Sequence, residues 1–181
     1  MTPATGLELR NVSLLAICQA LAMSCLSLIM TVSALVGMEL APEPALATFP
    51  LALQFVGTML AIVPASLFMK RYGRRAGFSL GAAFAIAGGG LSCLAIFESS
   101  FALFSVGSLS MGAFAAHAAF YRFAAADTAS ETFKSRAISL VLAGGLVAAF
   151  LGPELAKQSR ELFAPALFAG GYFTVSLLGI C

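Results

Sequence analysis

The sequence predicts an all-α integral membrane protein with six transmembrane helices, and three observations support this prediction. Of the 181 residues, 60% are hydrophobic and only 10% are charged, whereas soluble domains carry about 45–50% apolar and about 25% charged residues. The apolar residues form long uncharged runs, and lysine and arginine gather between alternate runs. So few charged side chains cannot cover a soluble domain of this size. The composition therefore excludes a soluble enzyme, a disordered chain and a nucleic-acid-binding protein.

The uncharged runs predict where the chain crosses the bilayer. They cover residues 11–38, 44–69, 76–97, 99–121, 137–153 and 162–181. A hydrocarbon core of about 30 Å needs about 20 helical residues. The fifth run has only 17 residues and is expected to include polar residues at its ends. The predicted spans are 12–37, 46–69, 76–97, 100–122, 137–156 and 163–181, in a single bundle over residues 1–181 that is truncated in or after its sixth helix.

Strands and a cleaved leader are poorer interpretations of these runs. Membrane barrels alternate polar and apolar residues over segments of about ten residues, whereas these runs are continuously apolar. In lipid, a segment that is not part of a barrel satisfies its backbone hydrogen bonds as a helix. The first run is longer than the apolar core of a signal peptide, about 7–15 residues, so it is expected to remain as a helix.

The distribution of positive charge predicts the orientation. Eight of the ten basic residues lie in the N-terminal tail and in the loops after the second and fourth runs, and the other two are Lys157 and Arg160. Lysine and arginine mark cytoplasmic loops. Both ends of this chain are therefore predicted to be cytoplasmic, in a multi-pass protein of the cell membrane.

Small residues and cysteines within the runs predict packing rather than chemistry. Gly144, Ala148 and Gly152 recur at a spacing of four just before Pro153, and such stripes let membrane helices approach closely. The four cysteines lie inside apolar runs without the spacing of a metal site or disulfide framework. No metal and no cofactor are expected.

The junction between the second and third runs is the most specific motif. Residues 66–75 read SLFMKRYGRR, so two long helices are joined by a short loop that holds four cations and one glycine. This junction resembles the loop motif G-x-x-x-D-R-x-G-R-R of the major facilitator superfamily. Arg71, Gly73, Arg74 and Arg75 fall on the matching positions. Lys70 replaces the family's aspartate, and a cation cannot accept the hydrogen bonds that this aspartate makes between the two halves of the transporter.

Two further stretches strengthen the resemblance. Asp127, followed by Lys134 and Arg136, is similar to the family's A-D … R-G-R-A loop. Gly152-Pro153 stands where the family's antiporter-type motif has its Gly-Pro. The resemblance implies two six-helix halves, each built from two inverted three-helix repeats. This chain would be the N-terminal half, and a second half in the same full-length chain or in a separate subunit would be its partner.

Polar residues inside the runs are candidates for the translocation path, because ionisable groups in the membrane are costly and mark functional sites. His117 and Tyr121 are expected to share one helix face, with Arg122 near its cytoplasmic end. Gln19, Gln54 and Glu154 are weaker candidates. Glu154 could instead pair with Lys157, and either glutamine could bind a neighbouring helix. Asp127, Lys134 and Arg136 are most simply a solvated loop, and a gating role for Asp127 is the alternative implied by the family.

These residues leave three candidate functions. The first is secondary transport of a small solute by alternating access, proton-coupled and antiporter-like or efflux-like. Sparse polar groups hint at an amphiphilic or weakly charged solute. The second, an intramembrane serine protease, is disfavoured because Ser110 lies seven residues before His117, about 10 Å along the helix. The third is a non-transporting scaffold or remnant. We expect a transporter, not an enzyme, whose partners are the lipid bilayer and an unidentified solute, with no nucleic acid.

Overall fold

The structure is a computed structural model that describes residues 6–160, 162–163 and 166–179. Within these residues every regular element is a helix, which confirms an all-helical membrane protein. The helices are α1 (Gly6–Leu40), the short 3₁₀ helix η1 (Pro44–Leu46), α2 (Phe49–Tyr72), α3 (Arg74–Phe97), α4 (Phe101–Ala118), α5 (Tyr121–Thr128), α6 (Lys134–Ser159) and α7 (Ala169–Leu178).

Five segments of the described chain are long and apolar enough to cross a membrane: Gly6–Leu40, Pro44–Tyr72, Arg74–Phe97, Phe101–Thr128 and Lys134–Ser159. The predicted sixth span, 163–181, differs from the helix in the structure. Its helix α7 begins at Ala169 rather than at residue 163 and has 10 described residues. Phe168, just before α7, has φ of +69°, a left-handed conformation that does not fit inside an α-helix. Residues 161, 164–165 and 180–181 lie outside the described part.

The prediction from the apolar run starts the sixth helix too early, because the segment before α7 is also apolar. Phe163, Leu167 and Phe168 pack against the core of the bundle without forming part of α7. Hydropathy alone does not separate a buried turn from a helix.

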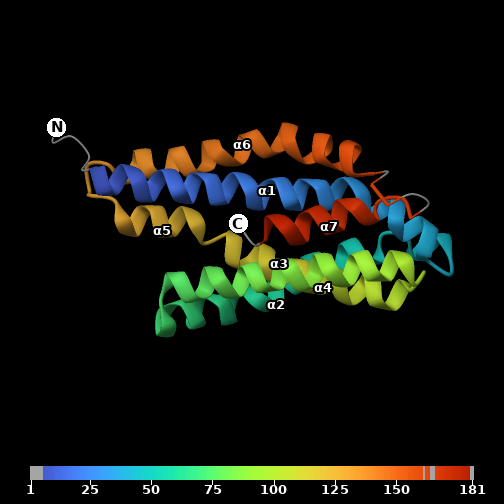
Figure 1. The fold of residues 1–181 in the computed structure, drawn as a ribbon. Helices are drawn as coiled ribbons and strands as arrows, with labels where there is room; N and C mark the ends of the chain where they lie inside the picture. The colour runs from blue at the N-terminus through green and yellow to red at the C-terminus, as the bar shows by residue number, and fades with distance from the viewer. Residues whose placement is uncertain (1–5, 161, 164–165, 180–181) are drawn as a thin grey trace.

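The long helices lie side by side and run in alternating directions (Figure 1). The helix α1 packs along α6, and α4 packs against both α2 and α3. Between these two groups lies α7, which contacts α3 and α1 (Figure 1). The start of α1, the α2–α3 junction and the α5–α6 loop share one end of the bundle, which we call the basic end. The α1–α2, α3–α4 and α6–α7 connections share the other end (Figure 1).

Glycine lets the helices in each group touch through their backbones. At the α2–α4 crossing, a Cβ atom on Gly112 would overlap the carbonyl oxygen of Gln54. The Thr58 hydroxyl there donates to the Gly112 carbonyl at 3.1 Å. At the α1–α6 crossing, a Cβ on Gly144 would overlap the Ala16 carbonyl oxygen, and Gly152 faces Ser27. Close packing of this kind is how helices associate in lipid, where burial of apolar surface gives little drive.

The helices α2 and α6, like α1, leave many large apolar side chains uncovered. On α2, Met59 and Leu60 are exposed, and on α6 the side chain of Phe150 is 82% exposed. In a bilayer these side chains would contact lipid or further helices.

Candidate functional site

The fourth span is interrupted between a long helix and a short one. The helix α4 ends at Ala118, and α5 begins at Tyr121, whereas the sequence predicts one continuous helix over 100–122. Across the break the Phe120 amide donates to the His117 carbonyl at 3.1 Å, a tighter turn than that of an α-helix. Whereas α4 packs on α2 and α3, α5 packs on α1 and α6. The break thus carries the chain from one helix group to the other (Figure 1).

A cavity of about 300 Å³ lies where the two groups separate. Its described walls come from α1, α3, the broken fourth span and the end of α7: Leu15, Cys18, Leu21, Ala22, Cys25, Phe78, Ser79, Ala82, Phe114, Tyr121, Leu178 and Gly179. Phe78 and Tyr121 are in ring contact, with centroids 4.5 Å apart. None of the described residues that line this cavity is charged, so it suits an uncharged solute or the uncharged part of one.

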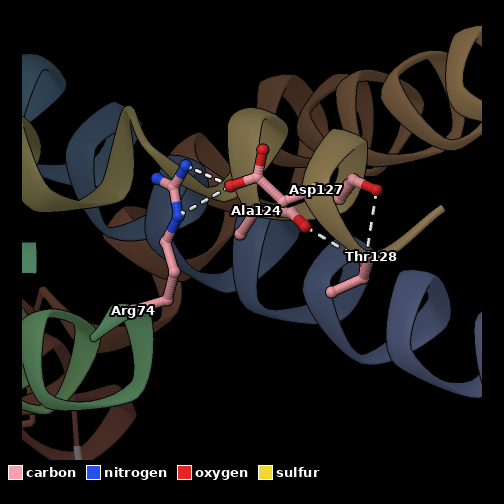
Figure 2. Close-up of polar contacts among 5 residues, drawn as sticks. Arg74, Ala124, Asp127 and Thr128 are labelled. Atoms are coloured by element: carbon pink, nitrogen blue, oxygen red, sulfur yellow. Dashed lines mark hydrogen bonds and ion pairs between the residues drawn. The ribbon is translucent and has the colours of Figure 1, made fainter. Parts of the chain in front are cut away.

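An ion pair joins α3 to α5 at the basic end, beyond the cavity. The Arg74 guanidinium donates to Asp127 Oδ2 from Nε at 3.1 Å and also from Nη2 (Figure 2). Thr128 closes the last turn of α5 by donating its hydroxyl to the carbonyls of Ala124 and Ala125, at 3.0 and 3.2 Å (Figure 2). Arg74 and Asp127 are 36% and 58% exposed. Exposed pairs contribute about 0.2–1 kcal/mol, so this pair can break and re-form easily.

The sequence predicts Asp127, Lys134 and Arg136 in a solvated loop, whereas Asp127 lies near the end of α5 and the other two lie at the start of α6. All three side chains are at least partly exposed, and a gating role for Asp127 stays a prediction. Lys134 lies 3.5 Å from Glu131, and Arg136 is exposed. Proximity in the sequence did not predict the pairing, because Asp127 lies in the last turn of α5 and pairs with Arg74 at the start of α3. The same end is tied a second time, since the Ser130 amide donates to Glu8 of α1 at 2.8 Å.

The basic junction reverses the chain at one residue. Gly73 has φ of +89°, which side chains disfavour, and its amide donates to the Met69 carbonyl at 2.9 Å. Lys70, Arg71 and Arg75 are exposed. Lys70 and Arg74 line a smaller pocket of about 260 Å³ with Ser66, Met69 and Phe120. The junction therefore presents several cations at the surface of the basic end.

Of the six residues predicted for the translocation path, Tyr121 is the one that lines the cavity between the two helix groups, which we call the aromatic cavity. His117 is 4% exposed and packs against α3, the helix that also carries Phe78. A Cβ atom on Gly81 would lie 2.6 Å from the His117 Cβ. Its Nδ1 lies 2.8 Å from the Ala113 carbonyl oxygen, whereas its buried Nε2 has no hydrogen-bond partner among the described residues.

The other predicted path residues lie elsewhere. Gln19 is buried where α1 faces Gly145 of α6, and Gln54 is buried where α2 crosses α4. Arg122 is exposed, with its guanidinium carbon 5.0 Å from the Phe123 ring centroid. Glu154 is exposed, accepts from Gln158 at 3.1 Å and lies 3.8 Å from Lys157. The roles of these residues stay predictions.

Sequence reasoning missed Phe78 and Phe114, which line the cavity beside Tyr121. A faint signal was present. Phe78 follows Arg74 by four residues, on one face of α3, and Phe114 precedes Tyr121 by seven. With 16 phenylalanines in the chain, such spacings are not distinctive.

One helical bundle thus holds an interrupted span, a cavity beside the interruption and a short charged junction. Comparison with known proteins gives the class of protein. The chain matches the model of the Major Facilitator Superfamily over residues 13–158 and belongs to that family. This confirms the resemblance drawn from the basic junction. Membership points to a transporter rather than an enzyme.

The chain is also similar to a particular member of the family. The chain is 41% identical over 180 residues to the riboflavin transporter RfnT of Brucella anthropi. The match covers 99% of this chain and 45% of that protein, so the chain spans less than half of the relative's length. No solved structure matches the chain.

Proposed function

We propose that this chain forms one six-helix half of a secondary transporter that carries riboflavin across the cell membrane by alternating access. Membership of the Major Facilitator Superfamily supports transport, and the relative in B. anthropi supports the substrate. The observation that carries the proposal is the cavity at the break of the fourth span. Its uncharged, partly aromatic walls suit a flavin, and discontinuous helices commonly line substrate sites in transporters.

The proposal includes a second six-helix half, in the same full-length chain or as a separate subunit. It would pack on the uncovered faces of α2 and α6, which carry exposed apolar residues such as Met59 and Phe150. The relative's greater length leaves room for such a half. Within this half we propose two inverted three-helix repeats: α1 to α3, and the broken fourth span to α7, with α7 as the sixth crossing.

We propose that the basic end lies in the cytoplasm, because seven of the ten basic residues lie at the start of α1, at the α2–α3 junction or at the start of α6, and lysine and arginine mark cytoplasmic loops. A cysteine introduced at exposed Tyr72, in protein lacking its native cysteines, should resist an impermeant thiol reagent in intact cells. A cysteine at exposed Glu43, beyond α1 at the other end, should be labelled. Strong labelling at position 72 would contradict this orientation.

In this mechanism the Arg74–Asp127 pair acts as a latch at the cytoplasmic mouth. It holds the end of α5 against the start of α3, and its release would let α5 move away from the cavity. Because both side chains are partly exposed, water can replace their contact at small cost.

Proton coupling is the remaining part of the proposal. Its support is the antiporter-like Gly152-Pro153 and the buried imidazole of His117, whose Nε2 has no partner among the described residues. Ionisable residues inside membrane spans commonly form proton relays in transporters.

The test is riboflavin uptake into proteoliposomes that contain the full-length protein, with and without an imposed pH gradient. We expect uptake that needs the protein and that the gradient accelerates. His117→Gln, which keeps a polar side chain but cannot be protonated, should transport without a response to the gradient. Absence of riboflavin uptake would refute the substrate. A gradient response equal to that of the wild type in His117→Gln would refute the role of His117.

A further inference from the structure

We infer that Phe78 and Tyr121 are the specificity-determining residues that stack on the tricyclic ring of the flavin. This inference rests on the proposed function and deepens it. The ring is planar, aromatic and larger than any side chain, so the part of the cavity that takes it must offer flat apolar surface.

The two side chains offer such a surface from two neighbouring helices. Phe78 comes from α3 and Tyr121 from the first position of α5, and their ring centroids lie 4.5 Å apart at an angle of 36°. Both rings are only partly buried and both line the cavity. Aromatic rings attract one another in offset or tilted contact, and stacking on a ring stabilises a bound aromatic base by about 1–3 kcal/mol.

The remaining walls fit the same occupant. Leu15, Leu21 and Ala82 are apolar and match the hydrocarbon edge of the ring. The hydroxyl group of Ser79 lies among the lining residues and can bond the polar edge. The absence of charge among the described lining residues agrees with an uncharged ring, because a buried charge without a partner would oppose its entry.

Position on the helices also makes this pair suitable for sensing the substrate. Arg74 lies one turn before Phe78 on α3, and Asp127 lies six residues after Tyr121 on α5. The ring pair and the ion pair therefore connect the same two helices at successive levels. A flavin that stacks on the rings occupies the space next to the latch.

The experiment compares riboflavin uptake by cells producing the full-length protein with its variants. Phe78→Leu and Tyr121→Leu replace a ring by a smaller aliphatic side chain, Tyr121→Phe keeps the ring, and Phe123→Leu is the matched control for the same loss of volume. Phe123 lies on the same helix but is exposed and outside the cavity lining. Protein levels in the membrane are measured for every variant.

We expect KM for riboflavin to rise about tenfold in the two ring-removing variants, the scale of one lost stack, with Vmax largely kept. Tyr121→Phe and Phe123→Leu should keep the wild-type KM. Lumichrome, which has the ring without the ribityl chain, should compete with riboflavin in the wild type. It should lose potency in parallel with riboflavin in the ring-removing variants.

Flavin fluorescence adds a readout that a merely structural role would not change. A stacked phenol ring quenches flavin emission by electron donation, whereas a phenyl ring does not. Tyr121→Phe should therefore bind riboflavin with unchanged affinity but with less quenching than the wild type.

The outcomes separate the two proposals. If the wild type takes up riboflavin while Phe78→Leu and Tyr121→Leu behave like Phe123→Leu, the stacking site is wrong and the proposed function stands. A fall in Vmax alone would also overturn the stacking site. If the wild type neither binds nor takes up riboflavin, the proposed function fails, and the flavin site fails with it.

Discussion

Replacement of Gly112 by alanine should destabilise the bundle, because α2 and α4 touch there through their backbones. The new Cβ would overlap the Gln54 carbonyl oxygen and lie 2.8 Å from the Thr58 amide nitrogen and 2.9 Å from the Gly57 Cα. All three are backbone atoms, so no side chain can rotate away and the helices must separate. Overpacking of this kind costs about 1–3 kcal/mol.

Gly90→Ala is the matched control, since it is also a glycine inside a long helix. Its added Cβ would meet only the Ser176 hydroxyl, at 3.9 Å. Alanine gains about 1 kcal/mol of helix propensity over glycine, and this gain is common to both variants. The difference in unfolding free energy between the two variants therefore isolates the clash, at about 1–3 kcal/mol.

The assay is thermal unfolding in detergent, followed by a dye that becomes fluorescent when it reacts with cysteines. Cys25 and Cys93 are buried and become reactive as the bundle opens. We expect Gly112→Ala to unfold at a lower temperature than Gly90→Ala. A Gly112→Ala protein as stable as Gly90→Ala would refute the backbone contact between α2 and α4.

Two further predictions concern the basic end. Asp127→Asn should slow riboflavin transport while changing the unfolding free energy by less than about 1 kcal/mol. The exchanged pair Arg74→Asp/Asp127→Arg should recover part of the rate, and Lys134→Gln, which loses only its neighbour Glu131, should transport normally. An exchanged pair slower than both single variants would argue against a latch. Gly73→Ala should destabilise the protein by about 1–3 kcal/mol, because φ of +89° strains any side chain although the space around it is open. Unfolding at the wild-type temperature would contradict this.

The membrane class and most helices were predictable, because segments that cross the lipid bilayer must be apolar and therefore stand out in the sequence. Runs of uncharged residues long enough to span the bilayer mark α2 and α3 closely, and the cations between them mark their junction. The helix α1 continues beyond the predicted 12–37 to Gly6–Leu40, because a helix does not stop where its surroundings become polar. Hydropathy reports the surroundings rather than the backbone.

The site was less predictable, because it depends on contacts between distant segments. No residue type around Ala119 and Phe120 predicts the helix break, since alanine and phenylalanine also occur within helices. The pairing of Asp127 with Arg74 joins residues 53 positions apart, whereas the sequence offered nearer cations. Tyr121 was found because a polar group in an apolar run is conspicuous, and Phe78 was missed because phenylalanine there is not.

Protection of one cysteine by substrate tests the central claim most directly. Cys18 of α1 is partly exposed and lines the aromatic cavity, so a full-length protein that keeps Cys18 as its single cysteine reports on that space. We predict that N-ethylmaleimide labels Cys18 and that saturating riboflavin slows the labelling markedly. A labelling rate that riboflavin does not change would contradict a riboflavin site in this cavity.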